Sequence, residues 1–175
     1  MVSVQTSLKC PACQRGNYQV IHTGIREDPL REVYGCNECG LQFIKPVIPD
    51  LYTFYRQEYR KNYGHDLTKR QTAAEHFAMM RPLMQSRVDL FTQRIPKGSI
   101  VLEVGCSSGY FLDSIKADYS CYGNEWNPQD AEHVRDVLGL PCSEERLEDA
   151  FPGQKFTCIA AFHVLEHLAD PIEWL

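Results

Sequence analysis

The chain has 175 residues, of which 43% are apolar and 23% are charged, as is usual for a folded globular protein. No apolar run approaches the roughly 20 residues that a membrane-spanning helix needs. The first residues also lack the basic start and apolar centre of a signal peptide. These features predict a cytoplasmic protein with no membrane partner.

The net charge of −5 is unevenly distributed along the chain. Residues 51–97 contain nine Lys and Arg against four Asp and Glu, whereas residues 126–175 contain three against ten. A nucleic-acid-binding protein would need a basic surface, so the acidic end argues against a nucleic-acid partner. The basic middle suits a phosphorylated substrate, although a solvated helix face explains it more simply.

Four of the eight cysteines form two closely spaced pairs near the N-terminus. Cys10 and Cys13 are separated by two residues, as are Cys36 and Cys39, and 22 residues lie between the pairs. This spacing lets both sulfurs of a pair face one ion, and two pairs complete a tetrahedral Zn²⁺ site. We expect zinc rather than two disulfides, because cytosolic thiols stay reduced. Four sulfurs leave no position for water, so the predicted ion is structural.

The residues around the cysteine pairs predict a small zinc ribbon over residues 1–48. Residues 18–22 and 32–34 alternate well enough to be the strands of a hairpin. A module of this size buries too little apolar surface to fold by burial alone, so zinc would stabilise it. The other cysteines are expected to be small buried apolar residues, namely Cys106, Cys121, Cys142 and Cys158.

The middle segment, residues 49–97, is predicted to be helical. Within it, Tyr55, Tyr59 and Tyr63 recur at four-residue spacing, which places them on one helix face. Such a stripe usually packs in a core, but a tyrosine hydroxyl beside a cofactor site can also contact a substrate. Both interpretations stay open.

A second helix is predicted over residues 72–95, where apolar residues keep a three- and four-residue spacing. Thr72 and Glu75 have the separation of a capping box at its start. Pro82 lacks the backbone N–H that a helix interior requires, so it must kink or divide this helix.

The last segment, residues 98–175, begins like a nucleotide-binding fold. Residues 100–104 form a β-branched strand that runs through Gly105-Cys106-Ser107-Ser108-Gly109 into an amphipathic helix. This turn is expected to present free backbone N–H groups to a ligand. The next strand ends in Glu125, where a nucleotide-binding βαβ unit keeps the carboxylate that accepts both ribose hydroxyls.

Two further strands are predicted beyond this point. A helix capped by Asn127 leads to a short third strand at residues 140–143. Residues 155–162 then form a fourth, buried strand, which runs into His163-Val164-Leu165-Glu166-His167.

Three motifs in this order resemble class I S-adenosylmethionine-dependent methyltransferases. They are Glu103-Val104-Gly105-Cys106-x-x-Gly109, Glu125 after the second strand, and the His163–His167 run after the fourth. Dinucleotide-binding dehydrogenases are less similar, because Cys106 stands where their G-x-G-x-x-G loop has its second glycine. The cysteine pairs and the Tyr-rich helix are similar to the branch that includes nucleotide-sugar C-methyltransferases.

The resemblance implies that S-adenosylmethionine is the cofactor. Glu103 and the glycine loop would hold its methionyl part, and Glu125 its ribose. Trp126 either lies beside the adenine or only packs within the protein, and Glu148 either approaches the adenine or is a solvated carboxylate. The cofactor site is thereby assigned to Glu103, Gly105, Cys106, Gly109, Glu125, Trp126, Glu148 and Phe162.

A nucleophile on the substrate must also lose a proton, and histidine suits that task near neutral pH. Spacings of three and four residues would bring His163, Glu166 and His167 to one face of a helical turn. We expect His167 to be the base, oriented by Glu166, with Tyr59 or Tyr63 assisting by resemblance. A divalent-metal site and a purely structural role are the alternatives for this set.

The predicted fold is therefore α/β: a zinc ribbon, a helical segment and a Rossmann-like methyltransferase core that is truncated after its fourth strand. By family analogy the strand order is 3-2-1-4, which leaves the fourth strand at an open edge. A second copy of the chain would cover that edge in a homodimer.

The predicted activity is methyl transfer to a small molecule, with a nucleotide-linked sugar methylated at carbon as the first candidate. O-methylation is an alternative, as is an RNA methyltransferase that uses its zinc ribbon to bind RNA. The third alternative is a fragment that binds the cofactor and zinc but catalyses no reaction.

Overall fold

The computed structural model describes residues 8–25, 28–44, 51–57, 72–168 and 170–174. The chain divides into two compact units, one made of residues 1–49 with 166–175 and the other of residues 50–165. The predicted positions Tyr59 and Tyr63 lie outside the described residues. None of the described helices is long and apolar enough to cross a membrane.

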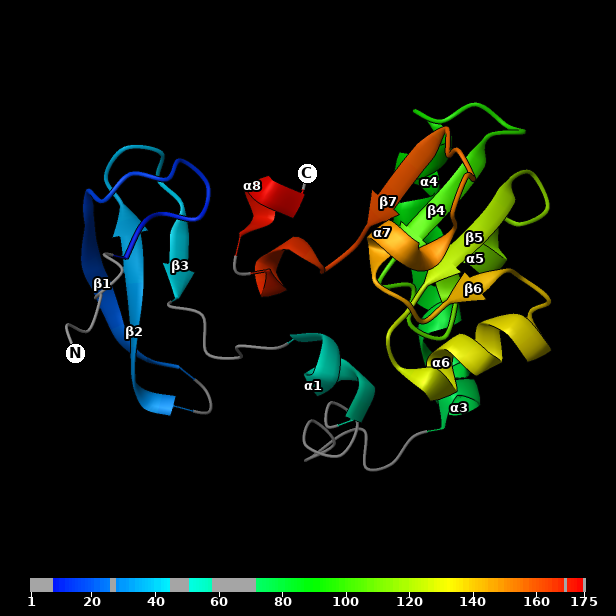
Figure 1. Cartoon of the computed structure of the whole chain (residues 1–175), viewed down its shortest axis with the longest axis horizontal. Helices are drawn as coiled ribbons and strands as arrows, with labels where there is room; N and C mark the ends of the chain where they lie inside the picture. Colours follow the sequence, from blue (N-terminus) through cyan, green and yellow to red (C-terminus); the bar gives the residue numbers. More distant parts are fainter. Residues whose placement is uncertain (1–7, 26–27, 45–50, 58–71, 169, 175) are drawn as a thin grey trace. The chain divides into compact units, whose positions relative to one another are not determined.

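The first unit is built on a three-stranded antiparallel sheet in the order β1-β2-β3 (Figure 1). The predicted hairpin strands are present and extend further than the sequence pattern indicated, and β3 is an additional strand. Tyr18 and Tyr34 meet edge to face at 5.3 Å between ring centroids, and both rings contact the buried Phe43. The strands are β1 (Tyr18–Ile25), β2 (Asp28–Cys36) and β3 (Gln42–Ile44).

Two short helical elements fall at the C-terminal end of the chain. The elements are the 3₁₀ helix η3 (Leu165–His167) and α8 (Pro171–Trp174).

The second unit contains a parallel four-stranded sheet in the order β6-β5-β4-β7, which confirms the predicted order 3-2-1-4. β4 occupies the predicted residues, and its neighbours β5 and β7 pair with it on either side (Figure 1). The α/β class is therefore confirmed. The strands are β4 (Ile100–Val104), β5 (Ser120–Asn124), β6 (Cys142–Ser143) and β7 (Cys158–Ala161).

Short helices precede the sheet and connect its strands. Thr72 and Glu75 form the predicted capping box, and Pro82 divides the predicted long helix by starting a 3₁₀ turn. The helices are α1 (Leu51–Gln57), α3 (Ala73–Met80), η1 (Arg81–Met84), α4 (Gln85–Thr92), α5 (Tyr110–Ile115), α6 (Pro128–Glu132), the π-helical turn η2 (His133–Val137) and α7 (Leu147–Ala150).

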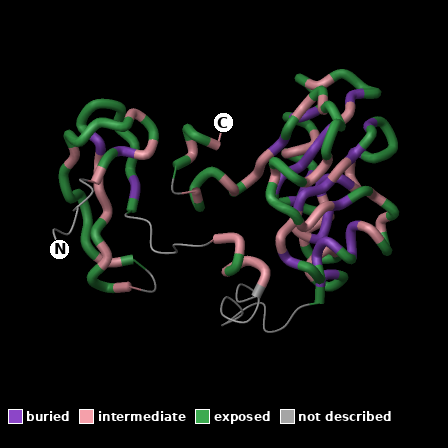
Figure 2. Tube along the Cα trace, viewed as in Figure 1, coloured by how far each residue is buried: buried purple, intermediate pink, exposed green. Residues whose placement is uncertain are grey.

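The core of the second unit lies between the sheet and helices α4 and α5. Phe91 of α4 meets Phe111 of α5 edge to face at 5.4 Å, and Val101 of β4 is fully buried with them. The buried segments concentrate in the sheet and in the helices that adjoin it (Figure 2). This packing holds β4 and the loop that follows it.

The expectation that the fourth strand is buried is wrong for part of it. Among the described residues, β7 pairs with β4 alone, and Ile159 is 55% exposed. Successive side chains of a strand point to opposite faces of the sheet, and in β7 Ala160 faces the core while Ile159 lies on the other, exposed face. Pairing of this edge with a second copy of the chain stays a prediction.

Candidate functional site

The candidate site lies where β4 and β5 end side by side. Val104 is directly opposite Asn124 in this parallel pair, so the loops that follow both strands share one edge of the sheet. Glu103 lies in β4, the Gly105–Gly109 loop follows it, and Glu125 follows β5. Ligands of open α/β sheets bind at this edge.

Backbone N–H groups of the glycine loop bond to Asn124 and Glu125, at the end of β5. The N–H groups of Gly105 and Cys106 both donate to the carbonyl of Asn124, at 2.8 and 3.2 Å. The N–H of Ser107 donates to Oε2 of Glu125 at 2.8 Å. The expectation of free N–H groups at these three positions is therefore wrong, because the parallel neighbour β5 supplies acceptors that the chain pattern does not reveal.

The two glycines of this loop are needed for different reasons. Gly105 has a φ of +68°, and a Cβ atom there would lie 2.8 Å from a methyl group of Val164. Gly109 has a φ of +81°, and its Cβ would lie 2.7 Å from Leu138 and 2.8 Å from Val134. Gly109 thus permits close packing of the loop on the segment that follows α6, rather than direct approach to a ligand.

Cys106 turns its side chain into the core. It is 1% exposed, and its Sγ lies 3.9 Å from Sγ of Cys142 in β6. The contact with Cys142, together with burial, raises the pKa of the Cys106 thiol well above its usual value. The side chain of Cys106 therefore packs in the core, and contact of this residue with a cofactor stays a prediction.

Glu103 is a buried acid, and one of its carboxyl oxygens has no hydrogen-bond partner among the described residues. Its side chain is 2% exposed, and among the described residues its Oε2 is the buried side-chain oxygen that lacks a hydrogen-bond partner. Burial raises the pKa of this carboxyl well above its ordinary range, while the positive charge of Arg87 opposes that rise. Such a group is rare unless it serves a ligand or a strained function.

Glu125 is oriented by two backbone groups. Its Oε2 accepts from Ser107, as above, and its Oε1 accepts from the N–H of Asn127 at 2.7 Å. These two bonds fix the Glu125 carboxylate at the carboxyl end of β5. The side chain of Asn127 caps α6 by accepting from the N–H of Gln129 at 3.1 Å, as predicted for this position.

Trp126 belongs to an aromatic group beside Glu125. Its ring lies edge to face with Tyr52 at 5.2 Å and at 6.4 Å from Tyr55, both on α1. Its Nε1 donates to the carbonyl of Glu145 at 3.2 Å. Tyr55, singled out from the sequence as part of a stripe, therefore contacts Trp126.

Two residues predicted to bind the cofactor, Glu148 and Phe162, lie apart from the glycine loop in sequence, and the structure gives their surroundings. Glu148 is exposed on α7. Phe162 packs edge to face on Phe111 at 4.9 Å, and the guanidinium of Arg87 lies 4.9 Å from the centre of its ring. Contact of these two residues with a cofactor stays a prediction.

Several residues around the loop were not singled out from the sequence. Nδ1 of His76, on α3, lies 3.3 Å from Oγ of Ser107, and Nδ1 of His133 lies 3.0 Å from the carbonyl of Ser108. Tyr110 opens α5, and its ring lies edge to face with the His76 ring at 5.6 Å between centroids. Residue type was the only sign in the sequence that these side chains could be functional. The bonding partners of the two histidines lie 25 or more residues away in the chain, so sequence spacing does not reveal them.

His163, Glu166 and His167 do not share a continuous helical turn. His163 directly follows the bend after β7 with a φ of +57°, whereas Glu166 and His167 lie in the 3₁₀ helix η3. The left-handed backbone at His163 interrupts the helical geometry that the spacing suggested. The boundary between the two compact units also falls between Leu165 and Glu166.

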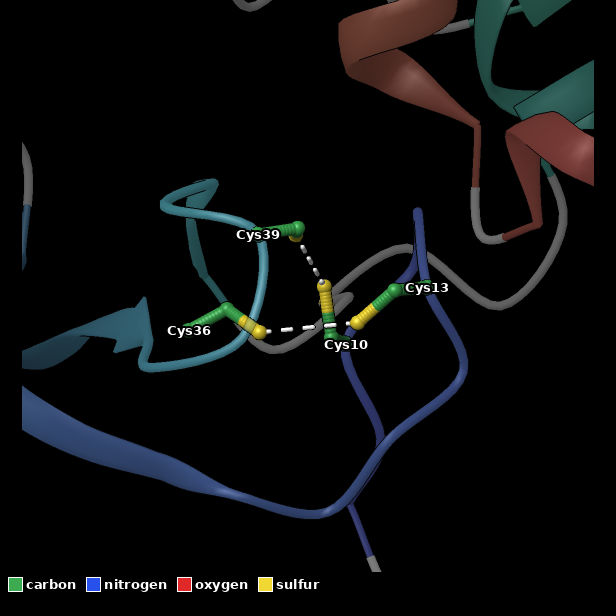
Figure 3. Close-up of side chains that lie close together, drawn as sticks. All are labelled: Cys10, Cys13, Cys36 and Cys39. Carbon is green, nitrogen blue, oxygen red and sulfur yellow. Dashed lines mark hydrogen bonds between the residues drawn. The ribbon is translucent and has the colours of Figure 1, made fainter.

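The four paired cysteines meet in the first unit (Figure 3). Their sulfurs all lie within 4.8 Å of one another, and this is the group among the described residues that could hold a metal ion. Sγ of Cys10 is 3.6 Å from that of Cys39, and Cys13 is 3.5 Å from Cys36. These separations exceed the ~2.05 Å of a disulfide, so the four thiols are free.

Comparison with known proteins gives a family for the second half of the chain. A family model described as a methyltransferase domain, Methyltransf_23, matches residues 76–175. A comparison with curated proteins found no match.

Solved structures with a similar fold were also found. DesVI from Streptomyces venezuelae is 20% identical with a TM-score of 0.43, covering 57% of this chain and 48% of that one. Magnesium protoporphyrin IX methyltransferase (ChlM) from Synechocystis PCC 6803, with bound SAM, is 16% identical with a TM-score of 0.44, covering 66% and 61%. The chain thus spans about half to three fifths of the length of these proteins.

Proposed function

The chain belongs to the methyltransferase-domain family, and on that premise we propose that it binds S-adenosylmethionine and transfers the methyl group to a small molecule. The observation that carries this proposal is the meeting of Glu103, the Gly105 turn and Glu125 at one edge of the parallel sheet. This edge is where open α/β sheets bind nucleotides.

The residues present fit such a cofactor. The unpaired oxygen of Glu103 can accept a hydrogen bond from an ammonium group. Glu125 is a carboxylate held at the end of β5, the residue type that accepts hydrogen bonds from ribose hydroxyls in nucleotide-binding folds. Gly105 keeps the backbone free of a side chain at the end of β4. The Trp126 ring offers an apolar face of the kind that packs against adenine.

When bound, the cofactor supplies an electrophilic methyl group, so the protein mainly needs to align the two partners. A carbon or hydroxyl nucleophile on the substrate must lose a proton to a base. We assign that role to His167, with Glu166 as its orienting group, and place His163 in the same set. Tyr59 and Tyr63 are proposed to assist at the substrate.

The proposed substrate is a nucleotide-linked sugar that is methylated at carbon. The support is the combination of paired cysteines and a tyrosine-rich segment ahead of the glycine loop, which resembles the sugar C-methyltransferases. A carbon next to a carbonyl loses a proton far more readily than an isolated one, so a keto sugar is the chemically suitable acceptor.

Cofactor binding is tested by titration calorimetry with S-adenosylhomocysteine, the stable product of methyl transfer. Glu125→Ala removes a charged acceptor, and we expect affinity to fall roughly 10- to 100-fold. Glu132→Ala is the matched control, because Glu132 is an exposed acid on α6 in the same unit. Absence of binding by the wild-type chain would refute the proposal.

We further propose that Cys10, Cys13, Cys36 and Cys39 hold a structural Zn²⁺ ion. The support is the convergence of four free sulfurs from two turns, which is the donor set of closed zinc sites. The purified chain should contain one zinc per molecule by elemental analysis. Cys36→Ser should lose it, whereas Cys158→Ser, outside the group, should keep it.

A further inference from the structure

Ser107, in the middle of the glycine loop, has a backbone conformation that favours glycine. Its φ is +50°, in the left-handed region, where a Cβ atom crowds the following carbonyl group. Gly105 and Gly109 have positive φ values at the two ends of the loop, but they carry no side chain that such a φ could strain. A strained residue persists only where its surroundings hold it, and such residues gather at functional sites. The Ser107 side chain is therefore expected to have a use that glycine could not serve.

Ser107 joins two other segments, one through its backbone and one through its side chain. Its N–H donates to Oε2 of Glu125 at 2.8 Å. Its Oγ lies 3.3 Å from Nδ1 of His76 on α3, and Oγ of the neighbouring Ser108 lies 3.5 Å from the same nitrogen. His76 thus contacts the loop at the residue whose N–H orients Glu125.

Helix α3 is packed in a way that gives His76 a defined place beside the loop. Ala73 is buried at the start of the helix, and the Phe77 ring lies 5.1 Å from the His133 ring between centroids. The His76 ring itself meets the Tyr110 ring edge to face at 5.6 Å. These contacts hold the imidazole in one orientation relative to the glycine loop.

We infer that His76 is a positioning residue for the carboxylate that binds the ribose of the cofactor. The imidazole holds the Ser107 hydroxyl, and this contact keeps the strained backbone in place. The Ser107 N–H then fixes Glu125 in the orientation that accepts the ribose hydroxyls. This inference rests on the proposed function, and it gives a role to a histidine outside the three motifs that indicated the family.

A thermodynamic cycle between His76 and the ribose tests this role, by titration calorimetry on the full chain. The ligands are S-adenosylhomocysteine and its 2′-deoxy analogue, which lacks one hydroxyl that Glu125 is proposed to accept. The wild type should bind the analogue roughly 10-fold or more weakly, because a hydrogen bond to a charged group is lost. His76→Leu should weaken S-adenosylhomocysteine roughly 5- to 10-fold and change the affinity for the analogue less than about twofold.

Two further variants separate positioning from packing. His76→Asn keeps an amide atom near the place of Nδ1 and should retain most of the preference for ribose. Ser107→Gly removes the hydroxyl and relieves the positive φ, so it should fold and lose the preference as far as His76→Leu does. The double variant should lose no more than either single one, because the two residues act as a unit.

His22→Leu is the matched control, because His22 is exposed on β1 in the other compact unit. Thermal unfolding of each variant checks that it is folded. If the wild-type chain binds neither ligand, the proposed function fails. If it binds both ligands equally, or if His76→Leu weakens both by the same factor, His76 does not position Glu125 while the cofactor assignment stands.

Discussion

Replacing Glu103 by Gln should make the ligand-free second unit more stable. The side chain is 2% exposed and one oxygen lacks a partner, so the folded state carries an uncompensated acid. Gln has nearly the same shape and still carries a polar amide, but it removes the cost of keeping an acid buried, either charged or with a proton bound. We expect this change to raise the free energy of unfolding by about 1–3 kcal/mol near pH 8.

The gain should depend on pH in a defined direction. Burial raises the pKa of Glu103 in the folded state above its unfolded value of about 4.3. The folded state then holds a proton that the unfolded state has released, so wild-type stability falls as pH rises above that unfolded value. The advantage of Glu103→Gln should consequently be largest at high pH and shrink as pH falls toward about 4.3.

Urea unfolding followed by tryptophan fluorescence measures this effect. Trp126 lies in the second unit and Trp174 in the other, so a Trp174→Phe background reports on the second unit alone. S-adenosylhomocysteine at about 100 times its Kd should add about 2.7 kcal/mol to the wild type and much less to the variant. A variant that is less stable at every pH, with no pH dependence, would refute the reasoning about Glu103.

Three further changes test other parts of the structure. Gly109→Ala should destabilise the second unit by about 2–4 kcal/mol in urea unfolding, because the new Cβ meets Leu138 and Val134 at a positive φ. The control Gly153→Ala, with a φ of +80° and no atom within 4 Å of the new Cβ, should cost only about 1–2 kcal/mol. Equal losses of stability in the two variants would argue against the packing role of Gly109. Thr72→Ala removes the capping box of α3 and should cost about 1 kcal/mol, whereas Thr92→Ala should stay within about 0.5 kcal/mol. His167→Ala should lower methyl transfer to a nucleotide-linked keto sugar roughly 100-fold or more while the affinity for S-adenosylhomocysteine stays the same; unchanged turnover would remove His167 as the base.

Much of the second unit could be predicted from local patterns. β4, the capping box at Thr72 and the break at Pro82 follow from residue type and spacing, and all are found where the sequence indicated. The convergence of the four cysteines was also predicted, because paired cysteines at short spacing have few other uses in a small module. Each of these features depends on residues that are close in the chain or on a strongly constrained side chain.

Tertiary structure decided the roles of individual residues at the site. Cys106 points into the core because Cys142 of β6 packs opposite it, and Gly109 is required by the segment after α6. Arg87 of α4 lies over the ring of Phe162, which follows β7, so this contact joins segments that are 75 residues apart in the chain. The sequence by itself determined the fold class, the family motifs and the cysteine cluster. Which side chains face a ligand depends on contacts between distant segments, and only the packed structure supplies those.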